Sequence, residues 1–171
     1  MQRPEKTEYA PYYETYVSLV DETDIVATLQ NQLDEMQNLL GEISEEKAAR
    51  AYAEGKWTIK ELIGHLNDGE KIFVYRALRI ARADKTPMEG FEQDGYIENA
   101  NFNECRFKDL VEEFTLSRRA NILFFKNLTE EAWTRTGTAS GSAVSVRALA
   151  YIIIGHVRHH TNILRSRYLN Q

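Results

Sequence analysis

Apolar residues recur at steps of three and four along four long segments of the chain. In the first segment they include Ile25, Leu29 and Leu33, and in the third they include Leu110 and Phe114. This spacing places apolar side chains on one face of an α-helix. The pattern therefore predicts four amphipathic helices, within residues 21–44, 57–83, 107–128 and 146–169.

Helix-start signals accompany the first, second and fourth of these segments. Thr58 followed by Glu61 has the form of a capping box, in which side chains bind backbone N–H groups at the helix start. Thr23 or Asp24 can cap the first helix, and Ser145 can cap the fourth. We therefore expect three of the helices to begin next to these residues.

The remaining segments are shorter and more varied. A short helix is expected before Gly55, and another short turn follows Thr129. Residues 84–96 contain Pro and Gly and predict a loop. The aromatic N-terminal stretch around Pro11 looks extended and is expected to pack across the outside of the core. The small, polar residues 134–146 predict an irregular loop or a small hairpin.

These elements predict an all-α fold, a four-helix bundle with short additional helices. The loop before the last helix is long enough for a crossover connection. No repeat, low-complexity tract or flexible linker divides the sequence. We therefore expect one domain spanning residues 1–171.

Composition and charge narrow the class of protein. Hydrophobic residues make up 43% of the chain and the formal net charge is −5, which does not favour a general nucleic-acid binder. No apolar run is long enough to span a membrane, and the N-terminus lacks the apolar core of a signal peptide. Cys105 is the single cysteine, so no intramolecular disulfide can form. A cytoplasmic protein with an incidental structural cysteine is expected.

Three of the four histidines lie within five positions of the last predicted helix. His156 and His160 are four residues apart and fall inside its apolar stripe, whereas His159 falls at the edge of that stripe. His65 lies on the second predicted helix beside the apolar positions Leu62 and Leu66. His65, His156 and His160 can therefore converge between two helices.

A cluster of inward-facing histidines has two interpretations. Each ring can be an ordinary core histidine with its own hydrogen-bond partners. Alternatively, the rings can bind a divalent metal, because neutral imidazoles are common metal ligands and coordination removes the repulsion between like charges. Three protein ligands leave a coordination position open, which is typical of catalytic rather than structural sites. Zinc, nickel or iron suits such a ligand set.

The stretches KWTIKELIGHLNDGE, YRALRIARADKTPMEGFEQDGY and VSVRALAYIIIGHVRHHTNILRSRYL make the sequence similar to the DinB-like superfamily. This group of four-helix bundles also contains bacillithiol transferases and mycothiol-dependent enzymes. The resemblance covers nearly the whole chain. It implies an up-down-down-up bundle, frequent homodimers and a metal triad at the positions of His65, His156 and His160.

The resemblance also implies a small-molecule substrate. In one reading the metal activates a low-molecular-weight thiol for transfer to an electrophile, and in the other it activates water for hydrolysis. A third reading, of a different class, is a non-enzymatic dimeric bundle with a structural or incidental metal. A fourth protein ligand would favour that third reading.

Several charged residues are candidates to support the site. Asp94 could orient a ligand histidine or a water, or simply form a turn before Gly95. Asp68 and Glu70 follow His65 closely, but ordinary solvated or ion-paired carboxylates are the simpler interpretation. His159 could supply a hydrogen bond or lie at the surface.

Three arginines form another candidate feature. They repeat at three-residue steps on the second predicted helix and could attract an anionic thiol. A solvated stripe paired with helix carboxylates is the simpler interpretation. The three are Arg76, Arg79 and Arg82.

Overall fold

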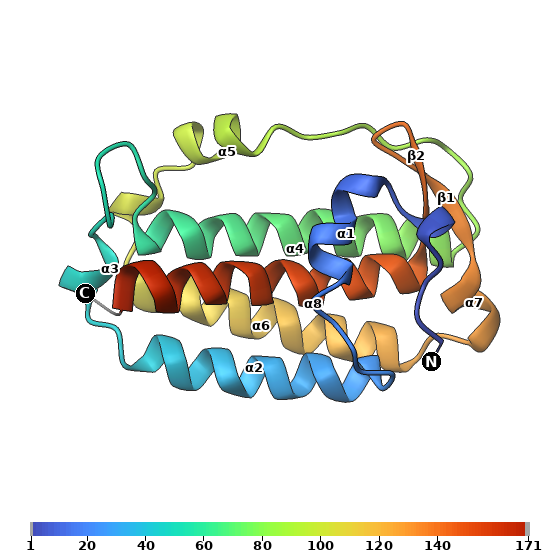
Figure 1. Cartoon of the computed structure of the whole chain (residues 1–171), viewed down its shortest axis with the longest axis horizontal. Coiled ribbons are helices and arrows are strands. Elements are labelled where there is room, and N and C mark those ends of the chain that lie inside the picture. The colour runs from blue at the N-terminus through green and yellow to red at the C-terminus, as the bar shows by residue number, and fades with distance from the viewer. Residues whose placement is uncertain (1, 170–171) are drawn as a thin grey trace.

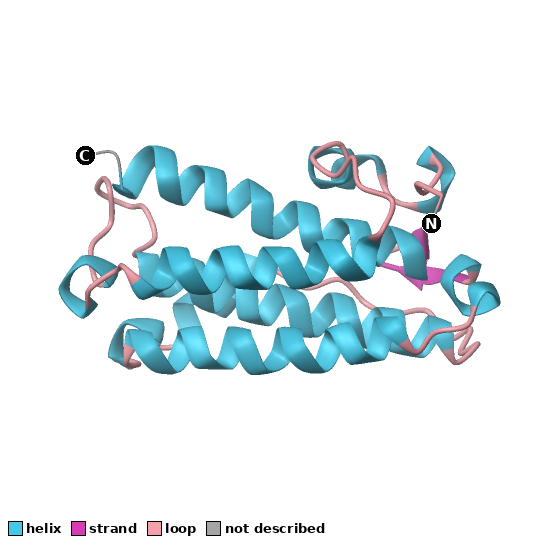
Figure 2. Ribbon diagram, turned by 90° about the horizontal axis from the view of Figure 1, so that it is seen from below, coloured by secondary structure: helices cyan, strands magenta, loops and turns pink. Residues whose placement is uncertain are grey.

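The computed structural model describes residues 2–169 and contains four long helices. They lie side by side along the long axis of the molecule (Figures 1 and 2). In Figure 1, the first and last run in one direction and the middle two run in the other, which confirms the predicted all-α bundle with up-down-down-up topology. These helices are α2 (Ile25–Gly41), α4 (Ile59–Ala81), α6 (Phe107–Lys126) and α8 (Val146–Ile163).

The predicted capping residues begin these helices. Asp24 accepts a hydrogen bond from the Ala27 amide at 3.1 Å, and Ser145 accepts one from Ala148 at 3.0 Å. Thr58 and Glu61 form the predicted capping box of α4. The apolar stripes that follow these caps meet in a common core.

The N-terminal segment is folded into short helical turns rather than extended. It consists of η1 (Lys6–Glu8), η2 (Pro11–Tyr13) and α1 (Glu14–Val17). Pro11 suits the first position of a helical turn because its φ angle is fixed and no N–H is needed there. The turn buries Tyr16 and Val17 against the bundle, so the segment packs on the outside of the core as expected but is coiled rather than extended.

A glycine allows this segment to approach α8 closely. A Cβ atom added at Gly155 would lie 2.1 Å from the backbone carbonyl oxygen of Tyr16. No larger residue fits without moving one of the two backbones. Gly155 therefore brings α1 against α8 beside the first histidine of the C-terminal cluster.

The other connections combine expected and unexpected elements. The predicted hairpin consists of β1 (Thr136–Ala139) and β2 (Ser142–Ser145), which pair antiparallel at one end of the bundle (Figure 2). Short helices α3 (Glu45–Ala48) and α7 (Glu130–Thr134) lie where short helical turns were expected. The chain also contains η3 (Phe102–Glu104) and, after α8, a π-helical turn η4 (Leu164–Leu169).

The predicted loop 84–96 is only partly a loop. Its last residues begin helix α5 (Gln93–Asn99), which buries Ile97. Pro and Gly punctuate the first part of the segment, but burial of one apolar side chain against α4 favours a helix in the second. Among the described residues, no helix is both long and apolar enough to cross a membrane.

Candidate metal centre

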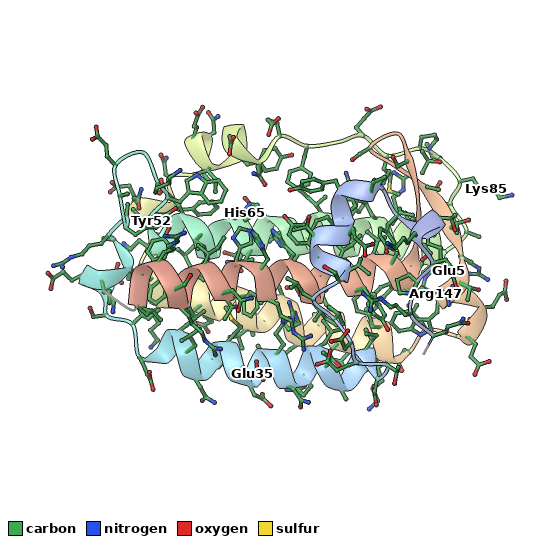
Figure 3. All side chains as sticks on the ribbon, in the orientation of Figure 1. Glu5, Glu35, Tyr52, His65, Lys85 and Arg147 are labelled. Atoms are coloured by element: carbon green, nitrogen blue, oxygen red, sulfur yellow. The ribbon has the colours of Figure 1, made fainter. Side chains whose placement is uncertain are left out.

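Three histidines meet between α4 and α8. His65 projects from α4, while His156 and His160 lie one turn apart on α8. The Nε2 atoms of His65 and His156 are 2.9 Å apart, and one potential ligand atom from each of the three rings lies within 4.8 Å of the others. Figure 3 shows His65 on α4, where that helix runs beside α8. The predicted convergence of the three histidines is present in the structure.

Aromatic side chains from other elements pack around the cluster. The Trp57 ring centre lies 5.0 Å from that of His65, and the Tyr16 ring centre lies 5.1 Å from that of His156. Phe73 contacts His156 on another side, with 5.8 Å between ring centres. These contacts limit the orientations that the His65 and His156 imidazoles can adopt.

Gly69 provides space for one of the imidazoles. A Cβ atom at this position would lie 3.0 Å from Cε1 of His156, a contact tighter than about nine in ten real Cβ contacts. A glycine in the middle of a helix costs about 1 kcal/mol relative to alanine. At this position the cost is offset by room for the His156 ring.

Burial keeps the three imidazoles neutral. Loss of solvation lowers the pKa of His65 to about 4 and that of His160 to about 3. His156 is also buried, and desolvation together with the neighbouring histidines holds its pKa well below the ordinary value of 6.5. At neutral pH all three rings therefore have nitrogen lone pairs available for a cation.

The protein itself leaves most of the hydrogen-bonding capacity of these rings unused. A neutral imidazole has one N–H donor and one acceptor nitrogen. In the part of the chain that the structure describes, the only side-chain hydrogen bond of the three rings joins His65 to His156. Among the described residues, Asn67 Oδ1 is the only fully buried side-chain nitrogen or oxygen without a partner. The unpaired ring nitrogens are therefore still accessible to a ligand that accepts imidazole lone pairs.

This donor set fits a first-row divalent metal. Neutral imidazole nitrogens are typical ligands of zinc, nickel and iron. Within residues 2–169, the group of histidine, cysteine and carboxylate side chains close enough to share an ion contains these three histidines and no fourth residue. In a four-coordinate site, three protein ligands would leave one coordination position for another ligand.

The neighbouring polar residues predicted from sequence lie around this cluster rather than within it. His159 is half-buried, and its ring centre lies 5.6 Å from that of Tyr16. Asp94 is exposed in the first turn of α5, where its charge opposes the lowering of the His65 pKa by burial. Asp68 is half-buried, and desolvation raises the pKa of its carboxyl group.

Glu70 is an ion-paired carboxylate, one of the two forms favoured from sequence, whereas Arg76 is not the solvated side chain that was expected. Glu70 is 2% exposed and forms a bidentate ion pair with Arg118. Arg76 is 3% exposed and donates hydrogen bonds to the Glu89 carbonyl and the Ser140 hydroxyl. The three arginines therefore do not form one solvated stripe, although Arg79 does pair with a carboxylate outside its helix.

Sequence reasoning missed a second polar cluster in the centre of the bundle. Arg118 is fully buried, and its Nη1 donates a hydrogen bond of 2.8 Å to the side chain of Gln32. The Gln32 amide in turn donates to the Ile154 carbonyl of α8 at 2.9 Å. The available signal was the position of Arg118 in the otherwise apolar stripe of α6, four residues after Phe114.

The protein is thus a helical bundle with a buried three-histidine cluster between its second and last long helices. The family model of the DinB superfamily matches residues 28–164, a segment that contains all three histidines. The chain belongs to this superfamily.

Two individual proteins resemble the chain over different extents. A protein of Oceanobacillus iheyensis, provisionally named a metal-dependent hydrolase, is 31% identical over 70 residues, which cover 40% of this chain and 38% of that relative. YfiT from Bacillus subtilis, described as a probable metal-dependent hydrolase with an unusual four-helix bundle topology, superimposes with a TM-score of 0.72. The superposition covers 96% of this chain and 92% of YfiT at 12% sequence identity, which establishes a shared fold.

Proposed function

We propose that the protein is a metal-dependent hydrolase acting on a small molecule, with His65, His156 and His160 as the ligands of a divalent metal. One observation carries the proposal: three buried, neutral imidazoles converge without a fourth protein ligand among the described residues. The description of two similar proteins as metal-dependent hydrolases supports the same reaction class.

In this proposal, residues of the chain bind the metal, orient the imidazole ligands and shield them from bulk water. The three imidazoles supply neutral nitrogen ligands from two helices, and the rings of Tyr16 and Trp57 restrict their rotation. Burial excludes bulk water from the histidine side of the site, which strengthens electrostatic interactions there. A divalent ion held by such ligands supplies Lewis acidity and lowers the pKa of a bound water or thiol.

The experiment begins with metal binding. The purified chain would be stripped with a chelator, reconstituted with zinc, nickel or iron(II), and analysed for bound metal. We expect one metal per chain for the unaltered protein. His65→Ala, His156→Ala and His160→Ala should each lose it under identical conditions, because a three-ligand site loses a full ligand.

Activity is then measured with metal-loaded and metal-free protein. A panel of carboxylic esters and amides tests hydrolysis, and bacillithiol or glutathione with a set of electrophiles tests thiol transfer. Metal-dependent hydrolysis would support the proposal, whereas metal-dependent thiol transfer alone would replace it with the transferase reading. Full metal occupancy in all three histidine variants would overturn the assignment of the site. Metal binding without either reaction would favour the non-enzymatic bundle.

A further inference from the structure

An aromatic pocket lies beside the histidine cluster. It is a cavity of about 260 Å³ between the N-terminal segment, α4 and the residues that lead into α5. Figure 1 shows α1 and α5 as separate short helices lying outside the four long ones. Five aromatic side chains line the pocket, namely Tyr12, Tyr13, Tyr16, Phe73 and Phe91.

Two of the lining rings also contact a proposed metal ligand. Tyr16 and Phe73 lie against His156, with ring centres 5.1 and 5.8 Å away from its centre. A further ring of the pocket, Phe91, packs against Phe73 at 6.5 Å. A molecule in the pocket would therefore be separated from the histidine cluster by the width of a single ring.

The size of the pocket suits one ring with a short substituent. A dry apolar cavity of about 150 Å³ is large enough to bind benzene, so 260 Å³ holds a benzene-sized group and a small extension. Pairs of aromatic rings prefer edge-to-face or offset packing, and several lining pairs already have this geometry, such as Tyr13 on Phe73 at 83°. Such walls favour a flat aromatic guest over an aliphatic one.

Two side chains of opposite charge lie near the pocket. Glu92 is exposed and lines the pocket, and no side-chain partner binds its carboxylate among the described residues. The Arg76 guanidinium lies 5.9 Å from the centre of the Phe91 ring and is paired with neutral oxygen acceptors rather than with a carboxylate. A charged guest is attracted by one of these groups and repelled by the other, so it gains no clear net attraction. Because it would also lose solvation among the aromatic walls, a neutral guest is favoured.

We infer that this pocket receives a neutral aromatic ring of the substrate. This inference rests on the proposed function, because it takes the pocket as part of the substrate site. The substrate class is then a small, uncharged aryl compound in which a short linker joins the ring to the bond that is hydrolysed. The ring lies among the tyrosines, and the linker passes the edge of Tyr16 or Phe73, the two pocket residues that contact His156.

Binding of simple probes tests the inference without requiring turnover. Benzyl alcohol and cyclohexylmethanol have the same number of carbon atoms and the same polar group, and they differ in aromaticity. Their dissociation constants would be measured by NMR titration of the full chain, with and without zinc. We expect benzyl alcohol to bind roughly twofold to tenfold more tightly, as the preference of aromatic rings for one another implies. Benzoate and benzylammonium should both bind more weakly than benzyl alcohol.

Variants of two pocket residues test where benzyl alcohol binds. Tyr12 is 64% exposed, so Tyr12→Ala leaves the core intact while removing one wall of the pocket, and Phe91→Leu removes a second ring. Both should weaken benzyl alcohol binding severalfold. Tyr75→Ala is the matched control, because Tyr75 is 54% exposed on α4 and does not line the pocket. Unchanged binding in both pocket variants, or equal binding of the two alcohols, would overturn the inference.

The outcomes separate this inference from the proposed function. Metal uptake with no preference for the aromatic probe would overturn the ring site alone. Preferential binding of benzyl alcohol by a chain that takes up no metal would support the ring site and overturn the proposed metal enzyme.

Discussion

Two polar clusters are buried in this bundle, and they differ in how far the protein satisfies them. In the first, Arg118, Glu70 and Gln32 bind one another, and every side-chain nitrogen and oxygen of the three has a partner. In the second, His65, His156 and His160 share a single side-chain hydrogen bond within the described residues. The first cluster joins α4, α6 and α2 to one another, whereas the second presents unused lone pairs between α4 and α8.

Complete hydrogen bonding distinguishes the polar cluster that stabilises the core from the one that is available to a ligand. A buried charge is tolerated when its partners are complete, and the bidentate Arg118–Glu70 pair meets this condition with distances of 2.7 and 2.8 Å. The histidine cluster differs, because its unpaired ring nitrogens are not fully buried among the described residues and remain accessible to a ligand. We therefore assign the arginine cluster to the fold and propose the histidine cluster as the binding site.

The largest expected effect comes from breaking the satisfied cluster. Arg118→Met leaves the Glu70 carboxylate buried with only the Asn121 amide as a partner, 2.9 Å away. Loss of one partner of a buried ion pair costs about 3–5 kcal/mol. We expect the free energy of unfolding of the metal-free chain, measured by urea denaturation at neutral pH, to fall by that amount.

Matched variants test the reason for this loss. Arg119→Met changes an exposed neighbour on the same helix and should shift stability by less than about 0.5 kcal/mol. A double variant that also carries Glu70→Met should be more stable than Arg118→Met alone, because no unpaired charge remains in the core. If the two losses simply added, the pair would not be coupled and the interpretation would be wrong.

The unsatisfied cluster should make the metal-free protein sensitive to acid. The pKa of His65 is about 4 in the folded chain and close to 6.5 when unfolded, so between these values the unfolded chain binds a proton that the folded chain does not. Stability is therefore fully present above pH 6.5 and is lost as the pH falls towards 4. This shift corresponds to about 3 kcal/mol from His65 alone.

The measurement is a series of urea denaturation curves between pH 7 and pH 4. His65→Leu should flatten this dependence, because the variant lacks one of the groups that take up protons on unfolding. A saturating metal should preserve stability to lower pH, since it binds only the neutral rings. Equal pH dependence in the unaltered chain and in His65→Leu would show that other groups control acid unfolding.

Sequence patterns were sufficient for the long helices and for the inward-facing positions of the three histidines, because both depend on local periodicity. The positions of His156 and His160 within the apolar stripe already fixed which face of α8 they share. The pairing of Arg118 with Glu70 was not predictable, because 48 residues separate the partners and periodicity does not specify which helices are neighbours.

The packing around the site was also beyond sequence reasoning. The pattern gave no reason for α1 to coil against α8, since the close approach of Tyr16 to Gly155 is a tertiary contact. Helix α5 was hidden for a related reason: its sequence is rich in turn-forming residues, and burial of Ile97 outweighs that local preference. Both elements bring residues to the aromatic pocket or its rim, so the pocket could not be foreseen.

A smaller effect is expected from reducing the space around one imidazole. Gly69→Ala adds a methyl group 3.0 Å from Cε1 of His156, so the ring must shift by a few tenths of an ångström. We expect metal affinity, measured by competition with a chromophoric chelator, to fall by about 10–100-fold, the range typical of changes around metal ligands. Gly95→Ala is the control, since a Cβ there meets nothing within 4 Å. Unchanged affinity in Gly69→Ala would mean that His156 is not held in a fixed position.

The smallest expected effect distinguishes the two adjacent histidines of α8. His159 touches Tyr16 and the edge of His160 at 5.0 Å between ring centres, but it is not part of the converging group. His159→Ala should therefore retain one metal per chain and lose no more than about tenfold in affinity, because only packing near a ligand changes. His160→Ala, one position along, should lose the metal. The pair of variants differs only in angle around the helix, so metal analysis of both after identical reconstitution tests the ligating face of α8 directly. An empty site in His159→Ala together with a loaded site in His160→Ala would place the ligands on the neighbouring face and remove His160 from the proposed triad.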